Sequence, residues 1–154
     1  MPVGAAAAVV SSLHVLALAL GLPGVFLRDR ALRAPLDAPG FRRLFAADNV
    51  WGLAALLWIV TGLLRAFGGL EKGTDFYLRS TLFWVKLGLF AAVFALELRP
   101  MLTLIRWRRQ LARGETPDTS SASTLSTLNH AELALVIVIV FVASLMTRGF
   151  GLRP

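Results

Sequence analysis

His14 is the first residue whose type and surroundings could support chemistry. Ser11, Ala17 and Gly21 lie on its helical face at positions i−3, i+3 and i+7. Such small residues leave room for a flat group or for a closely packed helix. Because neutral imidazole is a common ligand of haem iron and other metals, His14 is a candidate axial ligand of haem b. It could equally form a hydrogen bond with a neighbouring helix, and the sequence leaves both interpretations open.

Lys86 and Glu97 place opposite charges on one face of another apolar segment. They are eleven positions apart, and steps of about 100° return them to the same side of a helix, together with Phe90 and Phe94. Ionisable groups at membrane depth are costly and are functional hypotheses by default. Lys86 either contacts porphyrin carboxylates or extends its ammonium to the membrane surface, and Glu97 is open to pairing with a loop arginine.

Further polar residues stand where apolar segments begin. Asp48 and Asn49 precede one segment, and Asp48 is either a proton carrier or an acid at a helix N-terminus. Its face continues through small or apolar residues that predict a helix–helix contact: Gly52, Ala55, Ile59 and Gly62. Asn129 and Glu132 precede the last segment in the pattern of a capping box, and His130 between them is expected at the membrane interface.

Arginines and aromatic residues complete the candidate site. Arg65 and Arg148 each follow an apolar segment, where a guanidinium could bind haem propionates or lipid headgroups. Trp51, Trp58 and Phe90 could line an apolar pocket or only pack between helices. The candidate cofactor-binding residues are therefore His14, Lys86, Arg65, Arg148 and Trp51. Asp48, Asn49, Glu97, Asn129 and Glu132 are expected as other buried polar residues.

The composition identifies the elements that must position these residues. Hydrophobic residues make up 56% of the 154 residues and charged residues 16%, with a mean hydropathy of +0.69. Four apolar stretches, at about 3–27, 45–67, 81–105 and 131–147, are each long enough to approach or exceed the span of a hydrocarbon core about 30 Å thick. The sequence predicts one all-α domain over residues 1–154, an integral membrane four-helix bundle.

The distribution of basic residues predicts the orientation. Ten arginines lie in or beside the 28–44 and 106–128 loops, while five arginines and lysines lie on the other side: Arg65, Lys72, Arg79, Arg148 and Arg153. Cytoplasmic loops carry the excess of positive charge. We therefore expect a multi-pass protein of the bacterial inner membrane with both termini outside. Its net charge of +7 then reflects contact with lipid and not with nucleic acid.

The residues that thiol chemistry, phosphate binding, metalloprotease activity and copper transport need are missing or few in this sequence. The chain has no cysteine, two histidines and no phosphate-binding glycine loop or HExxH motif. Copper(I) prefers sulfur ligands, and the three methionines are not clustered, so copper transport is the weaker alternative. A structural or accessory membrane protein, whose polar groups only set helix register, remains a second hypothesis. Oligomerisation and the binding of a porphyrin or quinone are compatible with the sequence.

Several motifs resemble the HemJ family of four-helix membrane proteins. They are SSLHVLALALGLPGVFLRDRAL, FRRLF, FWVKLGLF and LNHAELALVIVIVFV. HemJ proteins are assigned as protoporphyrinogen oxidases and implicated in haem binding. The resemblance implies that His14 and Lys86 correspond to their first-span histidine and third-span lysine. Asn129 and Glu132 match their Asn-Glu pair with two residues inserted. The CopD copper-resistance membrane domain is similar in organisation.

A closer resemblance is to a bacterial family of predicted membrane proteins described as a domain of unknown function. It rests on ADNVWGLAALLWIVTGLLR, on FWVKLGLF with ELRP following, and on the final TRGFG. The DNxW run from Asp48 to Trp51 is not a HemJ feature, which argues against a shared substrate. Taken together, the sequence predicts a haem-binding, redox-linked membrane protein of the HemJ-like type, acting in porphyrin or electron-transfer chemistry.

Overall fold

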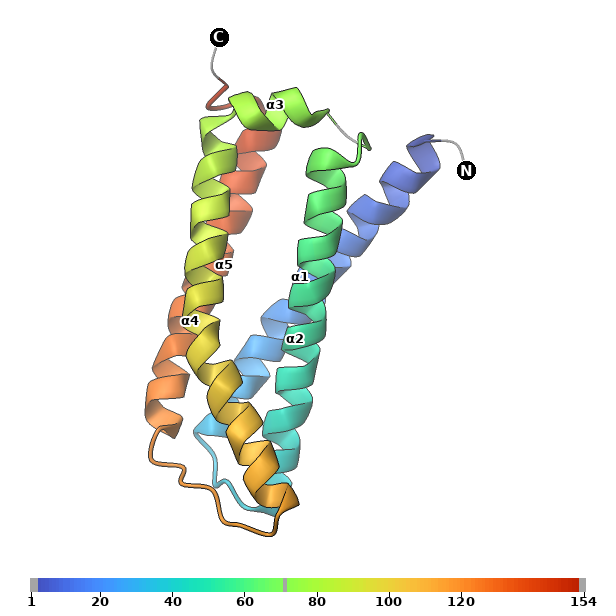
Figure 1. The fold of residues 1–154 in the computed structure, drawn as a ribbon. Helices are drawn as coiled ribbons and strands as arrows, with labels where there is room; N and C mark the ends of the chain where they lie inside the picture. The colour runs from blue at the N-terminus through green and yellow to red at the C-terminus, as the bar shows by residue number, and fades with distance from the viewer. Residues whose placement is uncertain (1–2, 71, 153–154) are drawn as a thin grey trace.

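Four long helices and one short helix make up the fold. The computed structural model describes residues 3–70 and 72–152, and within that part it contains no β-strand. The helices are α1 (Val3–Leu32), α2 (Ala38–Phe67), α3 (Thr74–Arg79), α4 (Thr81–Ala112) and α5 (Ala122–Thr147) (Figure 1). The predicted all-α fold class is confirmed.

The four long helices have the length and the surface of membrane spans. They contain 26 to 32 residues, and at about 1.5 Å per residue each exceeds a hydrocarbon core about 30 Å thick. Large apolar side chains cover their outer surfaces; Leu53 and Phe141, for example, are each 67% exposed. Such a surface is stable against lipid chains and would be unfavourable in water. Four of the five helices are thus candidate spans.

The helices pack as two hairpins. α1 packs against α2, α4 packs against α5, and α1 also contacts α5, while α3 lies across the ends of α2 and α4 (Figure 1). Close packing of α1 on α2 favours glycine, because a Cβ added at Gly24 would lie 3.1 Å from the backbone nitrogen of Trp51. A Cβ added at Gly21 would lie 3.3 Å from the ring of the same tryptophan. The small residues beyond His14 therefore serve a helix–helix contact.

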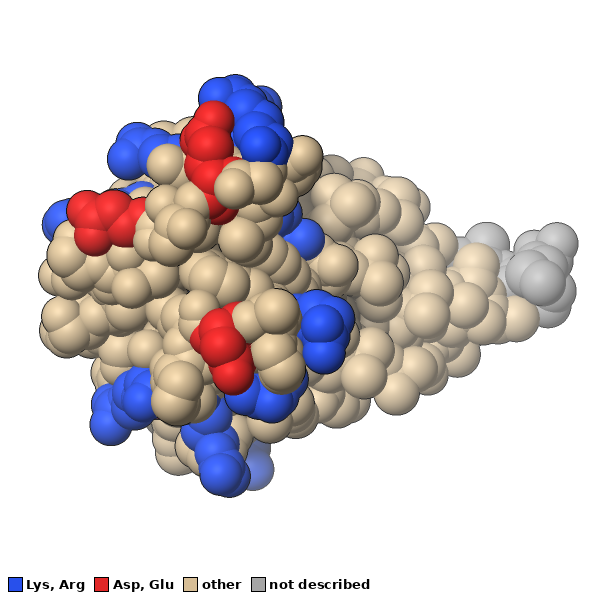
Figure 2. All heavy atoms as spheres, turned by 90° about the horizontal axis from the view of Figure 1, so that it is seen from below, with Lys and Arg blue, Asp and Glu red and all other residues tan. Residues whose placement is uncertain are grey.

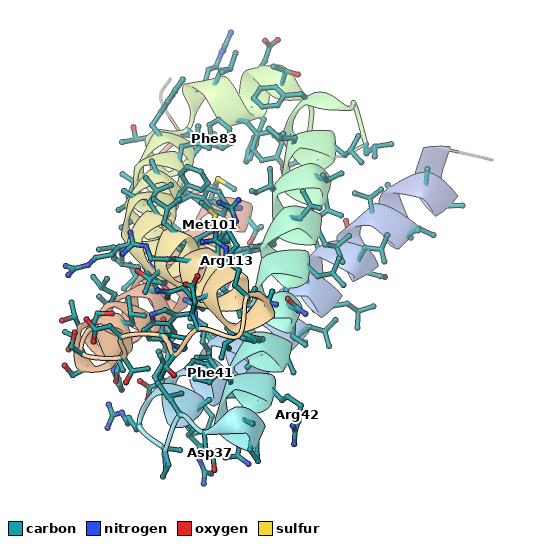
Figure 3. The ribbon with its side chains drawn as sticks, turned by 60° about the horizontal axis from the view of Figure 1, so that its bottom comes forward. Asp37, Phe41, Arg42, Phe83, Met101 and Arg113 are labelled. Atoms are coloured by element: carbon teal, nitrogen blue, oxygen red, sulfur yellow. The ribbon has the colours of Figure 1, made fainter. Side chains whose placement is uncertain are left out.

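The two ends of the bundle differ in charge. The start of α1, the end of α5 and α3 lie at one end, and the connections α1–α2 and α4–α5 lie at the other (Figure 1). Viewed from that second end, many arginine and lysine side chains lie around the part of the molecule nearest the viewer, with a few acidic side chains among them (Figure 2). Figure 3 shows Phe83 near α3 and Phe41 at the opposite end, where Arg42 is exposed. We call these the α3 end and the arginine-rich end; Arg153 lies outside the described residues.

The helices extend beyond the apolar stretches at the arginine-rich end. The 28–44 and 106–128 segments were expected as loops, but the connections contain only residues 33–37 and 113–121. Hydropathy marks where a helix contacts lipid, whereas the backbone hydrogen bonds continue into polar sequence. Asp37 caps α2 by accepting a hydrogen bond from the amide of Gly40 at 2.8 Å. In the second connection, the amide and hydroxyl of Ser120 donate to Asp118 and lower the pKa of that carboxyl.

These longer helices correct three local predictions. Asp48 lies well inside α2, so its assignment to a helix N-terminus is wrong. Asn129 and Glu132 lie inside α5, which begins at Ala122, so they do not form a capping box. Gly52 is exposed with no atom within 4 Å of an added Cβ, so the predicted helix contact does not extend to it. The first two errors follow from placing the helix starts too late, and the third from extending the contact face of α2 too far towards Asp48.

Candidate functional site

A fully buried arginine forms the centre of the largest polar cluster. Arg28, near the end of α1, has no exposed surface. Its Nη1 donates to Glu97 Oε1 at 2.7 Å and Asp48 Oδ1 at 3.1 Å. Its Nη2 faces Glu97 Oε2 at 2.7 Å, Asn129 Oδ1 at 2.7 Å and Glu132 Oε2 at 2.8 Å. We call these five residues the Arg28 cluster.

The Arg28 cluster joins all four long helices. Arg28 comes from α1, Asp48 from α2, Glu97 from α4, and Asn129 and Glu132 from α5. Asn129 and Glu132 are 1% and 0% exposed, whereas the side chains of Asp48 and Glu97 are each 19% exposed. Charges buried in this way must be paired and hydrogen-bonded to be tolerated. The cluster therefore fixes the relative register of the helices.

Two further side chains support the cluster from its edges. Trp51 Nε1 donates to Glu97 Oε2 at 3.0 Å, and the Trp51 ring lies 6.0 Å from the guanidinium carbon of Arg28. Arg108 Nη2 donates to Asp48 Oδ2 at 2.9 Å and to Asn49 Oδ1 at 2.9 Å. Asn49 is exposed, which corrects its assignment as a buried polar residue. Asp48 thus lies between two arginines, one buried and one at the surface.

A smaller polar group lies next to the Arg28 cluster on α1 and α5. Ser126 Oγ donates to Asp29 Oδ1 at 2.5 Å, and Arg33 Nε donates to Ser126 Oγ at 3.1 Å. Arg33 also contacts His130, whose Nδ1 lies 2.7 Å from the carbonyl oxygen of Ser126. The side chain of His130 is 52% exposed and therefore lies at the surface of the bundle. These contacts hold the end of α1 against the start of α5, and so join the two hairpins at the arginine-rich end.

His14 is held by a threonine of α2. Its Nδ1 lies 2.8 Å from Thr61 Oγ1, and that hydroxyl donates its one hydrogen to the carbonyl oxygen of Leu57 at 2.6 Å. Thr61 must therefore accept the hydrogen bond, which places the proton on His14 Nδ1 and the lone pair on Nε2. The ring of Trp58 lies 5.8 Å from the imidazole. The α2 contacts thus fix both the orientation and the tautomer of His14.

The imidazole borders cavities between the two hairpins. A cavity of about 220 Å³ near the α3 end is lined by His14, Trp58, Arg65, Tyr77, Phe83 and Lys86, among others. A second, of about 110 Å³, shares His14, Trp58 and Lys86 and lies between α2 and α4. A third, of about 40 Å³, is lined by Trp51, Trp58, Phe90 and Glu97. We call these three cavities together the seam.

The structure separates the predicted site residues into two groups. His14, Lys86 and Arg65 line one cavity, whereas Arg148 is exposed and is not among the residues that line it. Trp51, Glu97, Asp48, Asn129 and Glu132 belong to or contact the Arg28 cluster. Trp58 and Phe90 border both ends of the seam. The two groups therefore lie at opposite ends of the seam.

Arg28 was not among the predicted site residues, because its position after an apolar stretch placed it with the arginines of the 28–44 loop. A signal was present in the spacing: His14, Gly21 and Arg28 are seven residues apart and lie on one face of α1. An arginine on the same helix face as His14 is expected inside the bundle. Glu97 does pair with this arginine, as one interpretation of Glu97 anticipated, but Arg28 belongs to a helix and not to a loop.

A family model describing a predicted membrane protein, DUF2214, matches residues 6–151. No curated protein and no solved structure matches the chain. The resemblance to HemJ and CopD proteins therefore rests on the sequence motifs alone. Within the described part of the chain, no group of three or more His, Asp or Glu side chains could hold a metal ion. These findings establish the family, whose description names no reaction.

Proposed function

Given that the chain belongs to the DUF2214 family of predicted membrane proteins, we propose that it binds a flat, redox-active ring in the seam. The observation that carries this proposal is the fixed tautomer of His14 at a cavity that also contains Lys86 and Arg65. An imidazole with its lone pair on Nε2 can accept a proton or bind a metal. The two cations can bind carbonyl oxygens or carboxylates of the same ligand.

The cavity volume favours a single ring. Pockets for drug-sized ligands enclose about 300–1,000 Å³, whereas the cavity at His14 encloses about 220 Å³. A quinone headgroup is smaller than such ligands, and its carbonyl oxygens would accept hydrogen bonds from Lys86 or Arg65. His14 Nε2 would accept a hydroxyl proton of the reduced ring. An apolar tail would follow the part of the seam lined by Leu63 and Leu87, whose side chains are exposed on the lipid-facing surface.

Haem b is the second candidate ligand. The residues that line the cavity suit it, but the cavity is too small for it. Histidines that bind a metal usually donate their other ring N–H to a protein acceptor, as His14 Nδ1 does to Thr61. Lys86 and Arg65 are suitable partners for the two propionates. The cavity of about 220 Å³ does not enclose a porphyrin with α2 and α4 in their present positions. Haem binding would therefore require the two hairpins to separate.

Titration of the purified protein in lipid nanodiscs tests these alternatives. We expect a short-chain benzoquinone to quench tryptophan fluorescence saturably, with a Trp58→Phe variant losing most of the quenching because Trp58 borders the cavity. Haemin is titrated separately and followed by its Soret band. A Soret band without quinone quenching would favour haem b. Absence of both signals would overturn the proposal and favour a structural or accessory membrane protein.

We also propose that the arginine-rich end faces the cytoplasm in a bacterial inner membrane. The α1–α2 and α4–α5 connections carry the excess of arginine, and cytoplasmic loops attract this excess. Reporter fusions at Ser120 and after residue 154 should then give cytoplasmic and external activity, respectively. A fusion at Lys72 serves as a second external control. Cytoplasmic activity at Lys72 and after residue 154 would reverse the orientation.

A further inference from the structure

We propose that the Arg28 cluster is a proton-binding site that holds one proton on Glu132, shared with Glu97, at neutral pH. The proposal rests on the geometry of the cluster and does not depend on the ligand of the seam. Three properties support it: the count of charges, the count of hydrogen-bond donors, and the buried atoms that have no partner.

The charges of the cluster do not balance when every group is ionised. Asp48, Glu97 and Glu132 would carry three negative charges, whereas the cations in contact with them are Arg28 and Arg108. Asp48 contacts both arginines, and Glu97 pairs with Arg28 through two oxygens. Glu132 contacts only Nη2 of Arg28, which also faces Glu97 and Asn129. An uncompensated carboxylate is costly at a site with no exposed surface, and one bound proton removes the excess charge.

The hydrogen-bond donors of Arg28 give the same result independently. Each terminal guanidinium nitrogen carries two hydrogens. Nη1 faces two acceptor oxygens, but Nη2 faces three, from Glu97, Asn129 and Glu132, all within 2.8 Å. Two hydrogens can form direct, linear hydrogen bonds with only two of these three acceptors. A protonated Glu132 becomes a donor, which converts the surplus acceptor into a hydrogen-bond partner of its neighbours.

Unpartnered atoms lie at the same place. Glu132 Oε1, Asn129 Nδ2 and Arg28 Nε are buried and have no hydrogen-bond partner among the described residues. Buried polar groups in native proteins are nearly always satisfied by protein, water or an ion. Glu132 is fully buried, and its second oxygen is the atom on which the proton can reside. The orphaned oxygen of Glu132 therefore marks the place in the cluster where the proton can bind.

The groups facing this proton come from every helix that packs around it. Apart from Glu97 and Glu132, the charged groups in contact with the cluster are Arg28, Asp48 and Arg108, while Trp51 and Asn129 are neutral. Asp29, Arg33 and His130 form the adjacent group held through Ser126. In this adjacent group Arg33 pairs with Asp29, so neither residue changes the count of charges in the Arg28 cluster.

The Arg28 cluster lies between the seam and the arginine-rich end of the bundle. Glu97 lines the inner cavity of the seam with Trp51 and Trp58, and Asp48 is bonded to Arg108 at the arginine-rich end. A proton on the Glu97–Glu132 pair therefore lies between the seam and that end. If the ring proposed above occupies the seam, the pair is placed to exchange protons with it; this last step alone rests on the proposed function.

Infrared spectroscopy of the full chain in nanodiscs, without quinone or haem, tests the proton directly. At pH 7 we expect one C=O band of a protonated carboxylic acid, because exposed carboxyl groups are ionised at that pH. Labelling glutamate with ¹³C should shift the band, which distinguishes glutamate from aspartate without any mutation. A spectrum with no such band, or with a band whose frequency does not shift on ¹³C labelling of glutamate, would overturn the proposal.

Two substitutions locate the proton. Glu132→Gln should remove the band, and the matched control Glu115→Gln should keep it, because Glu115 is exposed. Glu97→Gln should also remove the band, since two carboxylates then balance two arginines and Glu132 ionises. A band that persists in Glu97→Gln would show that Glu132 is protonated by burial alone, without sharing, and would contradict the shared site. Because no seam ligand is present, the result is independent of the ring-binding proposal.

Discussion

Replacing Arg28 by Gln is expected to lower the free energy of unfolding by about 3–5 kcal/mol, the effect of removing one partner of a buried ion pair. The substitution leaves Asp48, Glu97 and Glu132 close together with no buried cation. It also removes the bonds by which α1 contacts α2, α4 and α5 through this cluster. Denaturant unfolding in detergent micelles, followed by circular dichroism, measures the change.

Arg30 provides the matched control for this prediction. It lies two residues further along α1 and is exposed, so Arg30→Gln should change stability by no more than about 0.5 kcal/mol. Adding Glu132→Gln to Arg28→Gln should recover part of the loss, because it removes one of the unpaired buried acids. Equal stability of the Arg28 and Arg30 variants would show that the cluster does not hold the bundle together.

Replacing His14 by Ala is expected to abolish saturable binding of the ring ligand in the seam. The substitution removes the Nε2 lone pair and the only imidazole that lines the cavity at the α3 end. Thr61→Val should have a smaller effect, because His14 remains but loses the partner that sets its tautomer. The loss of a hydrogen bond to a buried group corresponds to about 1–3 kcal/mol, or roughly a fivefold to 150-fold weaker affinity. Fluorescence titration with the benzoquinone measures both variants.

His130 supplies the control for the loss of a histidine. Its side chain is 52% exposed and belongs to the group at the arginine-rich end, away from the cavity at His14. His130→Ala should therefore bind the quinone with the affinity of the unchanged protein. If His14→Ala and His130→Ala bind equally well, the ligand does not contact His14 and the site must be sought elsewhere in the seam.

The sequence alone determined the architecture, because the number and length of the apolar segments set the number and length of the helices. Each segment had to form a helix, since a backbone in lipid must satisfy its own hydrogen bonds, and four segments yield four long helices. The excess of arginine in the sequence likewise lies in and beside the α1–α2 and α4–α5 connections, which share one end of the bundle. The helix ends were less predictable, because hydropathy falls before helical hydrogen bonding stops, as at Ala38 and Ala122.

The sequence also identified most polar residues of the site, since a polar group within an apolar stretch is visible by its rarity. His14, Lys86 and Glu97 were found in this way. Their partners were decided by the tertiary structure, because a partner depends on which helix faces meet and at what depth. Lys86 and Glu97 share a helix face in the sequence, yet Lys86 lines the cavity of His14 while Glu97 bonds Arg28.

Arg28 shows most clearly what only the tertiary structure decided. In the sequence it follows an apolar run and resembles the other arginines of a positively charged loop. In the folded chain α1 continues to Leu32, and carboxylates of α2, α4 and α5 meet around the guanidinium. No local pattern specifies that meeting, because it arises from residues 20 to 104 positions away. The sequence therefore contained the charges of the cluster, and helix packing alone brought them together.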